Sequence, residues 1–163
     1  MPDFQSGDMW SAYAQAGLFL ITTNATITRN GRLVMGRGIA KQVRDRFPSL
    51  AAALGQQIQQ QCGSLGTYGL LISPRWPTAK LGAFQVKYHF GETADLALIQ
   101  QSAAALHRWA TAHPDVAIHR NMPGIDCQRQ PMARLPRTAV LLHIQQLPHN
   151  VTIWEYPRQP TSA

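Results

Sequence analysis

The residues best suited to hold an anion are two glycines, Gly36 and Gly38, which open a predicted helix. Glycine lets backbone N–H groups approach an anion because it has no Cβ in the way. The start of a helix adds unpaired N–H donors and a partial positive charge. A glycine pair before a helix is more often a simple tight turn. A phosphate cradle and a plain turn are therefore both open interpretations of this loop.

Two further side chains directly follow predicted strands. Asn24 comes after the apolar, β-branched run 17–23, and Lys87 comes after the run 81–86. Asn is a common turn former at a strand end, and a lysine there often only lays its stem along the surface. A lysine becomes a nucleophile when burial or neighbouring cations lower its pKa. Because ligands of α/β sheets collect at the carboxyl ends of strands, both side chains are expected at one edge if the two strands are parallel.

The elements that must position these residues alternate between strands and helices along the chain. This alternation predicts an α/β layered sheet in a single domain spanning 1–163, with polar tails at about 1–7 and 158–163. The predicted strands are 17–23, 68–73, 81–86, 116–119 and 151–154; the predicted helices are 38–61 with a break at Pro48, 94–112 capped by Thr93, and 137–147; a turn is predicted at Asn30–Gly31.

Composition narrows the class of protein. The chain has 163 residues and a net charge of +7, and twelve of its fifteen basic residues are arginines. Arginine suits phosphate oxygens, so the charge fits either an ordinary basic surface or a polyanionic partner. The two cysteines lie far apart, no His/Cys spacing suggests a metal, and no secretory signal or membrane span is visible. We therefore expect no metal, no cofactor, no membrane partner and a cytoplasmic location.

The stretch 21–50 carries a more specific signal. It reads ITTNATITRNGRLVMGRGIAKQVRDRFPSL and resembles the first ligand loop of a branch of the macrodomain family, in which a strand ends in Thr-Thr-Asn and Met-Gly-x-Gly-Ile-Ala opens a helix. The resemblance implies a three-layer α/β/α fold with a mixed central sheet and ADP-ribose or a related nucleotide as ligand. It implies that Asn24 bonds the distal ribose and that backbone groups hold phosphate. The ligand residues implied here are Thr23, Asn24, Gly36, Arg37, Gly38, Ile39 and Ala40.

Two shorter matches concern the adenine. Gly7-Asp8 is similar to the macrodomain Gly-Asp whose carboxylate accepts from the adenine amino group, and Met9 is assigned with it. Asp8 could equally cap a helix from Trp10 onward. Tyr156 follows the last predicted strand and either packs on an adenine or closes the edge of the core. Both interpretations stay open at each position.

The stretch 84–90, Phe-Gln-Val-Lys-Tyr-His-Phe, resembles a Phe-Pro-x-Lys-x-His-Trp segment. That segment occurs in macrodomains similar to the antitoxins that remove ADP-ribose from DNA, and in the related terminal ADP-ribose glycohydrolases. The resemblance implies that Lys87 attacks or stabilises the anomeric carbon, with Asn24 orienting the ribose. Gln85 stands in place of the usual proline and Phe90 in place of the usual tryptophan.

A second glycine-rich loop is expected after a late strand. Macrodomains carry Pro-Gly-x-Gly-x-Gly there, whereas this chain has Asp126 and Gln128 where glycines are expected. A carboxylate beside a diphosphate repels it unless it is paired, protonated or turned away. The catalytic aspartate of the terminal glycohydrolases aligns with Gln128, so that acid is lost or moved. The ligand residues implied in this loop are Pro123, Gly124, Ile125, Asp126 and Cys127.

Three hypotheses for the function follow. The first is an ADP-ribosyl glycohydrolase in which Lys87 is the key residue, and the second is a module that binds ADP-ribose and does no chemistry. The third is a basic nucleic-acid-binding protein on the same scaffold. The presence of Lys87 favours the first hypothesis, and the altered second loop favours the second. The net charge of +7 permits the third, or an ADP-ribosylated nucleic acid or protein as partner.

Overall fold

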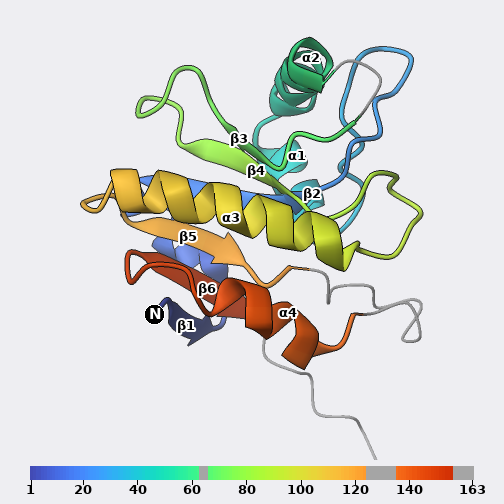
Figure 1. The fold of residues 1–163 in the computed structure, drawn as a ribbon. Coiled ribbons are helices and arrows are strands. Elements are labelled where there is room, and N and C mark those ends of the chain that lie inside the picture. Colours follow the sequence, from blue (N-terminus) through green and yellow to red (C-terminus); the bar gives the residue numbers. More distant parts are fainter. Residues whose placement is uncertain (63–65, 124–134, 156–163) are drawn as a thin grey trace, which may run out of the picture.

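A computed structural model describes residues 1–62, 66–123 and 135–155 and contains a six-stranded sheet (Figure 1). The strand order is β1-β6-β5-β2-β4-β3. β3 runs antiparallel to β4, and every other neighbouring pair is parallel, so the sheet is mixed as expected. The strands are β1 (Asp3–Ser6), β2 (Leu18–Thr23), β3 (Leu70–Ile72), β4 (Leu81–Gln85), β5 (Ile118–Asn121) and β6 (Val151–Glu155).

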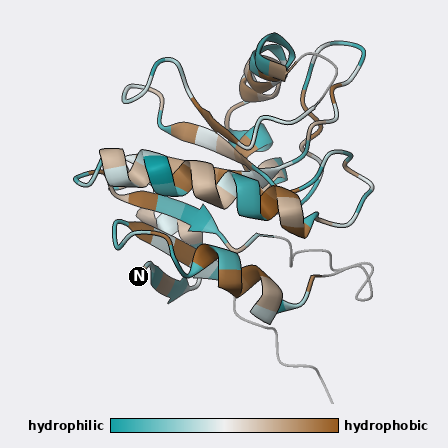
Figure 2. Cartoon of the chain, in the orientation of Figure 1, coloured by the Kyte–Doolittle hydropathy of each residue, from teal (hydrophilic) through white to brown (hydrophobic). Residues whose placement is uncertain are grey.

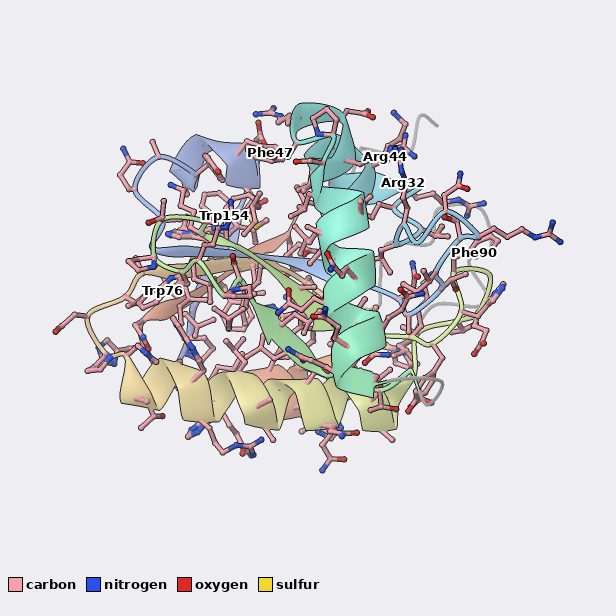
Figure 3. All side chains as sticks on the ribbon, turned by 90° about the horizontal axis from the view of Figure 1, so that it is seen from above. Arg32, Arg44, Phe47, Trp76, Phe90 and Trp154 are labelled. Carbon is pink, nitrogen blue, oxygen red and sulfur yellow. The ribbon has the colours of Figure 1, made fainter. Side chains whose placement is uncertain are left out.

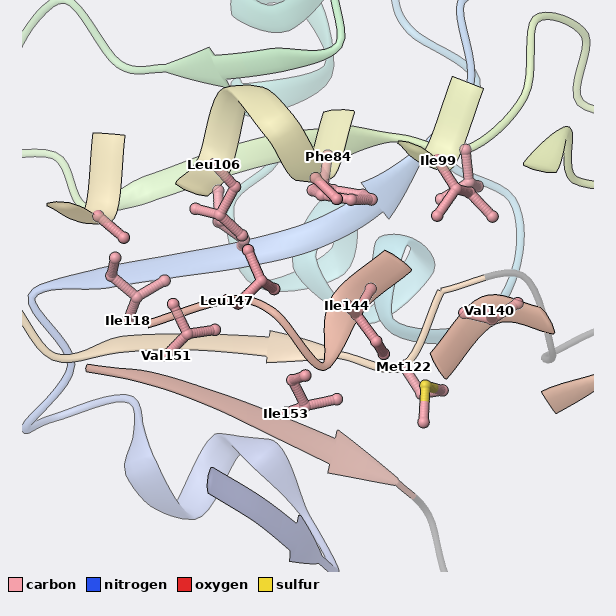
Figure 4. Close-up of a cluster of buried hydrophobic side chains, with 14 of the residues drawn as sticks. Phe84, Ile99, Leu106, Ile118, Met122, Val140, Ile144, Leu147, Val151 and Ile153 are labelled. Carbon is pink, nitrogen blue, oxygen red and sulfur yellow. The ribbon is translucent and has the colours of Figure 1, made fainter. Parts of the chain in front are cut away.

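Helices cover both faces of this sheet, which makes three layers (Figure 1). One apolar cluster joins the strands to α3 and α4, and its side chains interdigitate between the helices and the sheet (Figure 4). A second cluster joins the other face to α1, α2 and η1. The apolar segments of the strands lie between these layers (Figure 2). The helices are η1 (Met9–Ala12), α1 (Gly38–Arg46), α2 (Leu50–Cys62), α3 (Leu96–Ala112) and α4 (Arg137–Ile144).

Three expected boundaries were wrong. Asp95, not Thr93, caps α3, because the Asp95 carboxylate accepts from the Leu98 N–H at 3.0 Å. The fifth strand lies two residues later than 116–119, since the polar Arg120 and Asn121 continue the ladder and are buried. The helix predicted for 137–147 ends at Ile144, although Leu147 is buried against the core as expected.

The amino-terminal segment also departs from expectation. Residues 1–7 were expected to form a polar tail, but Asp3–Ser6 pairs in parallel with β6 as the edge strand β1. All four residues are exposed, and their place in the sheet rests on backbone hydrogen bonds. An edge strand without a buried face leaves no apolar alternation in the sequence, which explains why the pattern did not reveal it. The tail expected at 158–163 lies outside the described residues.

One close approach fixes the turn that leads into α1. Gly55 in α2 lies against the Asn30–Gly31 turn, where a Cβ on Gly55 would stand 2.0 Å from the Gly31 carbonyl oxygen. Gly31 has a φ of +77°, as its predicted turn role requires. The Leu33 N–H then donates to the Ala51 carbonyl at 2.9 Å. The loop that carries Gly36 and Gly38 is therefore anchored on α2.

Within residues 1–62, 66–123 and 135–155, no helix combines the length and apolar character that crossing a bilayer requires. Among these same residues, His, Cys, Asp and Glu side chains nowhere gather in a group of three that could hold a metal ion.

Candidate functional site

The site lies where β2 and β4 end at the same edge of the sheet. The two strands are parallel, Thr23 is in register with Gln85, and the Val86 N–H donates to the Thr23 carbonyl at 3.0 Å. The expectation that Asn24 and Lys87 share one edge of the sheet required these two strands to be parallel, and they are. Asn24 and Lys87 leave neighbouring strands side by side, as a shared ligand edge requires.

A pocket of about 320 Å³ opens at this edge. It brings together eight of the residues predicted from the sequence, which come from the end of β2, the glycine loop, the first turn of α1 and the segment after β4. These eight are Thr23, Asn24, Gly36, Arg37, Gly38, Ile39, Ala40 and Lys87. The other lining residues are Thr22, Val34, Met35, Val86, Phe90, Glu92, Thr93 and Ala94.

The glycine loop presents open backbone to the pocket. Gly38 has a φ of +57°, a conformation that favours glycine, and it is the first residue of α1. A Cβ on Gly36 or on Gly38 would meet no atom of the described residues within 4 Å, so these residues leave the space beside both glycines open. Arg37 precedes α1 without a capping side-chain hydrogen bond, and the first turn has no acidic residue. The N–H groups at this helix start are thus available to an anion.

Asn24 shapes the pocket wall through both ends of its amide. The Oδ1 atom accepts from the Thr26 N–H at 2.8 Å, and the Nδ2 atom donates to the Val34 carbonyl at 2.9 Å. The first contact is the local turn expected of an Asn at a strand end, and the second ties the end of β2 to the segment before Gly36. Asn24 is 7% exposed and lines the pocket. It therefore has a structural role, and it also remains within reach of a ligand.

The lysine segment is tied to the glycine-loop segment by backbone contacts. The Ala25 N–H donates to the Tyr88 carbonyl at 2.9 Å, and the Phe90 N–H donates to the Thr26 hydroxyl at 3.0 Å. These contacts hold the half-buried Lys87 in the pocket wall. Phe90 is 52% exposed at the pocket rim and lies at the end of the molecule opposite Trp76 (Figure 3).

The charged groups in the described lining are two cations and one carboxylate. Arg37 and Lys87 supply the positive charges, and Glu92 supplies the negative one. Their balance, together with open backbone N–H groups, suits an anion that also carries hydroxyl groups. The described lining thus combines backbone N–H donors at the start of α1 with the side chains of Asn24 and Lys87.

The structure does not bring every predicted residue to this pocket. Asp8 and Met9 lie outside the described lining, and the Asp8 carboxylate caps η1 by accepting from the Trp10 N–H at 3.0 Å. The capping interpretation of Asp8 is thereby confirmed. Pro123 is buried and is not among the lining residues. The predicted residues Gly124, Ile125, Asp126, Cys127 and Tyr156, and also Gln128, lie outside the described residues.

Two buried residues behind the pocket were not anticipated. Gln85 is 0% exposed and bonds the segment 66–69. Asn121 is 4% exposed, and its side chain accepts from the Thr22 N–H at 3.1 Å and donates to the Thr22 hydroxyl at 2.9 Å. The sequence shows only that both residues are amides near the end of a strand. Polarity alone would have placed both of them on the surface.

Solved structures of other proteins share this architecture. The macrodomain of Thermus aquaticus DarG aligns with a TM-score of 0.69 and 20% identity, covering 96% of this chain and 98% of that one. The macrodomain of Mycobacterium tuberculosis DarG aligns with a TM-score of 0.66 and 23% identity, covering 98% and 99%. No protein-family model and no curated protein sequence matches the chain. The fold is therefore that of a macrodomain, as the sequence predicted.

A third structure, Thermosipho africanus DarTG in complex with ADP-ribose, aligns with a TM-score of 0.63 and 15% identity. The alignment covers 99% of this chain and 43% of the DarTG chain. The likeness to all three proteins extends over nearly the whole of the present chain. DarG macrodomains and DarTG are thus among the solved proteins that share this fold.

Proposed function

We propose that this macrodomain-fold protein binds ADP-ribose, or the ADP-ribosyl group of a larger molecule, in the pocket at the ends of β2 and β4. One observation carries the proposal: Gly36 and Gly38 leave open space beside the uncapped start of α1, next to Asn24 and Lys87. The diphosphate would take the N–H groups of the helix start. Asn24 would contact the distal ribose. The ADP-ribose in the DarTG structure supports this ligand class.

Titration calorimetry with ADP-ribose and with AMP tests this assignment. We expect ADP-ribose to bind and AMP to bind more weakly, because AMP lacks the second phosphate and the distal ribose. A protein that gives neither heat nor a thermal shift with millimolar ADP-ribose does not have this function.

The variant Gly36→Val tests whether ADP-ribose binds in the open space beside the glycine loop. Gly36 does not have a left-handed φ, and none of the described residues places an atom within 4 Å of a Cβ there, so the variant should fold. Its branched side chain would instead fill the open space that the diphosphate needs. We expect ADP-ribose binding to be lost. Ala104→Val, on the exposed part of α3, is the matched control and should bind as the wild type does.

Hydrolysis of ADP-ribosyl adducts is the second candidate function, and the presence of Lys87 in the lining favours it. In such a reaction the bond from the anomeric carbon to the adduct breaks, and the oxygen of water bonds to that carbon. The leaving group takes up a proton. A lysine beside the anomeric carbon could, as the neutral amine, attack that carbon with its lone pair or stabilise the positive charge that develops there.

The assay compares wild type and Lys87→Ala on ADP-ribosylated DNA and ADP-ribosylated protein in parallel. Release by the wild type and loss of release in Lys87→Ala, with ADP-ribose binding retained, would establish catalysis. Lys41→Ala, which removes an exposed lysine paired with Asp45, is the control and should leave release unchanged. Equal release by wild type and Lys87→Ala would remove Lys87 from the mechanism. Binding without release by the wild type would leave a binding module.

A further inference from the structure

A buried amide connects the two walls of the pocket from behind. Gln85 is the last residue of β4, and its side-chain oxygen accepts from the N–H groups of Tyr68 and Gly69 at 2.9 and 3.0 Å. Its Nε2 atom donates to the Gly66 carbonyl at 2.6 Å and to the Lys87 carbonyl at 3.4 Å. A single side chain therefore fastens the segment 66–69 to the backbone of the lysine.

The phenol of Tyr68 carries this connection on to the other wall. The Tyr68 hydroxyl donates to the Asn24 carbonyl at 2.6 Å and lies 2.5 Å from the Thr23 hydroxyl, which can donate to it in turn. Burial raises the pKa of the Tyr68 phenol above its ordinary 10.0, so the hydroxyl keeps its proton, and can donate, into the alkaline range. The chain of contacts thus runs from Lys87 through Gln85 and the segment 66–69 to Asn24.

We infer that Gln85 and Tyr68 are positioning residues that set the placement of Asn24 relative to Lys87. Neither of them is among the residues that line the pocket, so they act through the backbone of the residues that do. The proline found at the position of Gln85 in the resembled motif has no side-chain donor or acceptor, so it could not make these four contacts. The inference rests on the proposed binding of ADP-ribose.

A ligand that is held from two sides binds well only when the groups on both walls of the pocket are placed precisely. Asn24 and Lys87 belong to different strands and are followed by loops, so strand pairing alone fixes them only up to Thr23 and Gln85. Displacing a group in a site by about 1 Å can cost two orders of magnitude in rate. The hydrogen bonds of Gln85 restrict such displacement because its side chain is fully buried and has no water to exchange them with.

Tyr68→Phe tests the inference, because it removes only the hydroxyl and keeps the ring. We expect the dissociation constant for ADP-ribose to rise roughly three- to tenfold, the equivalent of one lost hydrogen bond. Where the wild type releases ADP-ribose from an adduct, kcat should fall further than KM rises. The control is Tyr13→Phe, because the Tyr13 hydroxyl makes no hydrogen bond to any residue that the structure describes. This control should bind as the wild type does.

Affinities are measured at a temperature well below the melting temperature of every variant, so that a merely structural role would change Tm and leave the dissociation constant unchanged. A wild type that binds while Tyr68→Phe binds equally well overturns the inference and leaves the proposed function intact. A wild type that does not bind ADP-ribose overturns both. A weakened Tyr68→Phe beside an unaffected Tyr13→Phe supports the positioning role.

Discussion

The carboxyl ends of β4 and β5 each bury a polar side chain, and the two are satisfied very differently. Gln85 at the end of β4 is neutral and makes four contacts through its amide. Arg120 in β5 donates from Nε and Nη2 to the same Asn121 carbonyl, each at 3.1 Å, and its Nη1 has no hydrogen-bond partner among the residues that the structure describes. Its guanidinium lies 3.7 Å from the centre of the Phe84 ring.

The difference shows what each strand end contributes. An amide that is fully hydrogen-bonded loses little on burial, whereas a buried guanidinium keeps a large desolvation cost. Burial lowers the pKa of Arg120 to about 9, which is the direction expected when a cation is taken out of water. The β4 end is thus a rigid support for the pocket. The β5 end holds a buried charge, and replacing it with an apolar side chain would remove its desolvation cost.

Gln85→Met should give the largest effect. It leaves the N–H groups of Tyr68 and Gly69 and the carbonyl of Gly66 without their partner. The Gly69 contact is buried and the other two are partly buried, and an unsatisfied buried group costs about 1–3 kcal/mol. We expect the free energy of unfolding to fall by roughly 3–5 kcal/mol in urea denaturation. Gln59→Met, on the exposed side of α2, is the control and should change little. A loss below about 1 kcal/mol would contradict the bracing role.

Arg120→Met should behave in the opposite way. It replaces a buried charge with an apolar side chain of similar length that can still pack on Phe84. The cost is the pair of hydrogen bonds to the Asn121 carbonyl, so we expect stability within about 1 kcal/mol of the wild type or above it. Arg120→Lys should be worse than Arg120→Met, since it buries a compact charge. A loss above about 3 kcal/mol in Arg120→Met would show that the guanidinium is net stabilising.

The β5 side should also set the acid dependence of stability. Burial lowers the pKa of His119 below its ordinary 6.5, and the neutral ring accepts from the Trp154 indole at 2.9 Å. The unfolded chain binds this proton more readily, so the free energy of unfolding should fall as the pH drops below 6.5 towards the folded pKa. Urea denaturation between pH 7.5 and 5 measures this slope. His119→Gln should flatten it, whereas the exposed His107→Gln should not.

The β4 side should contribute at the alkaline end, with the smallest effect near neutral pH. The pKa of Tyr68 is raised from its ordinary 10.0, so the unfolded chain loses this proton first. Stability from this residue is complete below pH 10 and should be lost as the pH rises through the interval above it. Tyr68→Phe should reduce the alkaline loss in urea denaturation. An unchanged alkaline limb in that variant would mean that the phenol is not held protonated by the fold.

The parts of the site that were predictable are local in sequence. Gly36, Gly38 and Ile39 form one loop and helix start, and Asn24 and Lys87 each follow an apolar strand. Types and spacing left their roles open, and the resemblance of the contiguous stretches 21–50 and 84–90 to macrodomain segments carried the prediction. The bracing by Gln85 depends on the segment 66–69, which reaches it only through tertiary contact. No periodicity encodes such a contact. The strand β5 was misplaced for a related reason, because Arg120 is charged and yet buried.

The missing side-chain cap of α1 has a consequence for how binding would be observed. Free helix starts fray, and their amide hydrogens exchange quickly with deuterated solvent. A diphosphate seated on Gly38 and Ile39 would act as the cap that Arg37 does not provide. Deuterium uptake in the first turn of α1 should therefore slow on addition of ADP-ribose, while uptake in the first turn of α3, which Asp95 already caps, stays the same. Binding of the ligand and ordering of the first turn of α1 would then occur together.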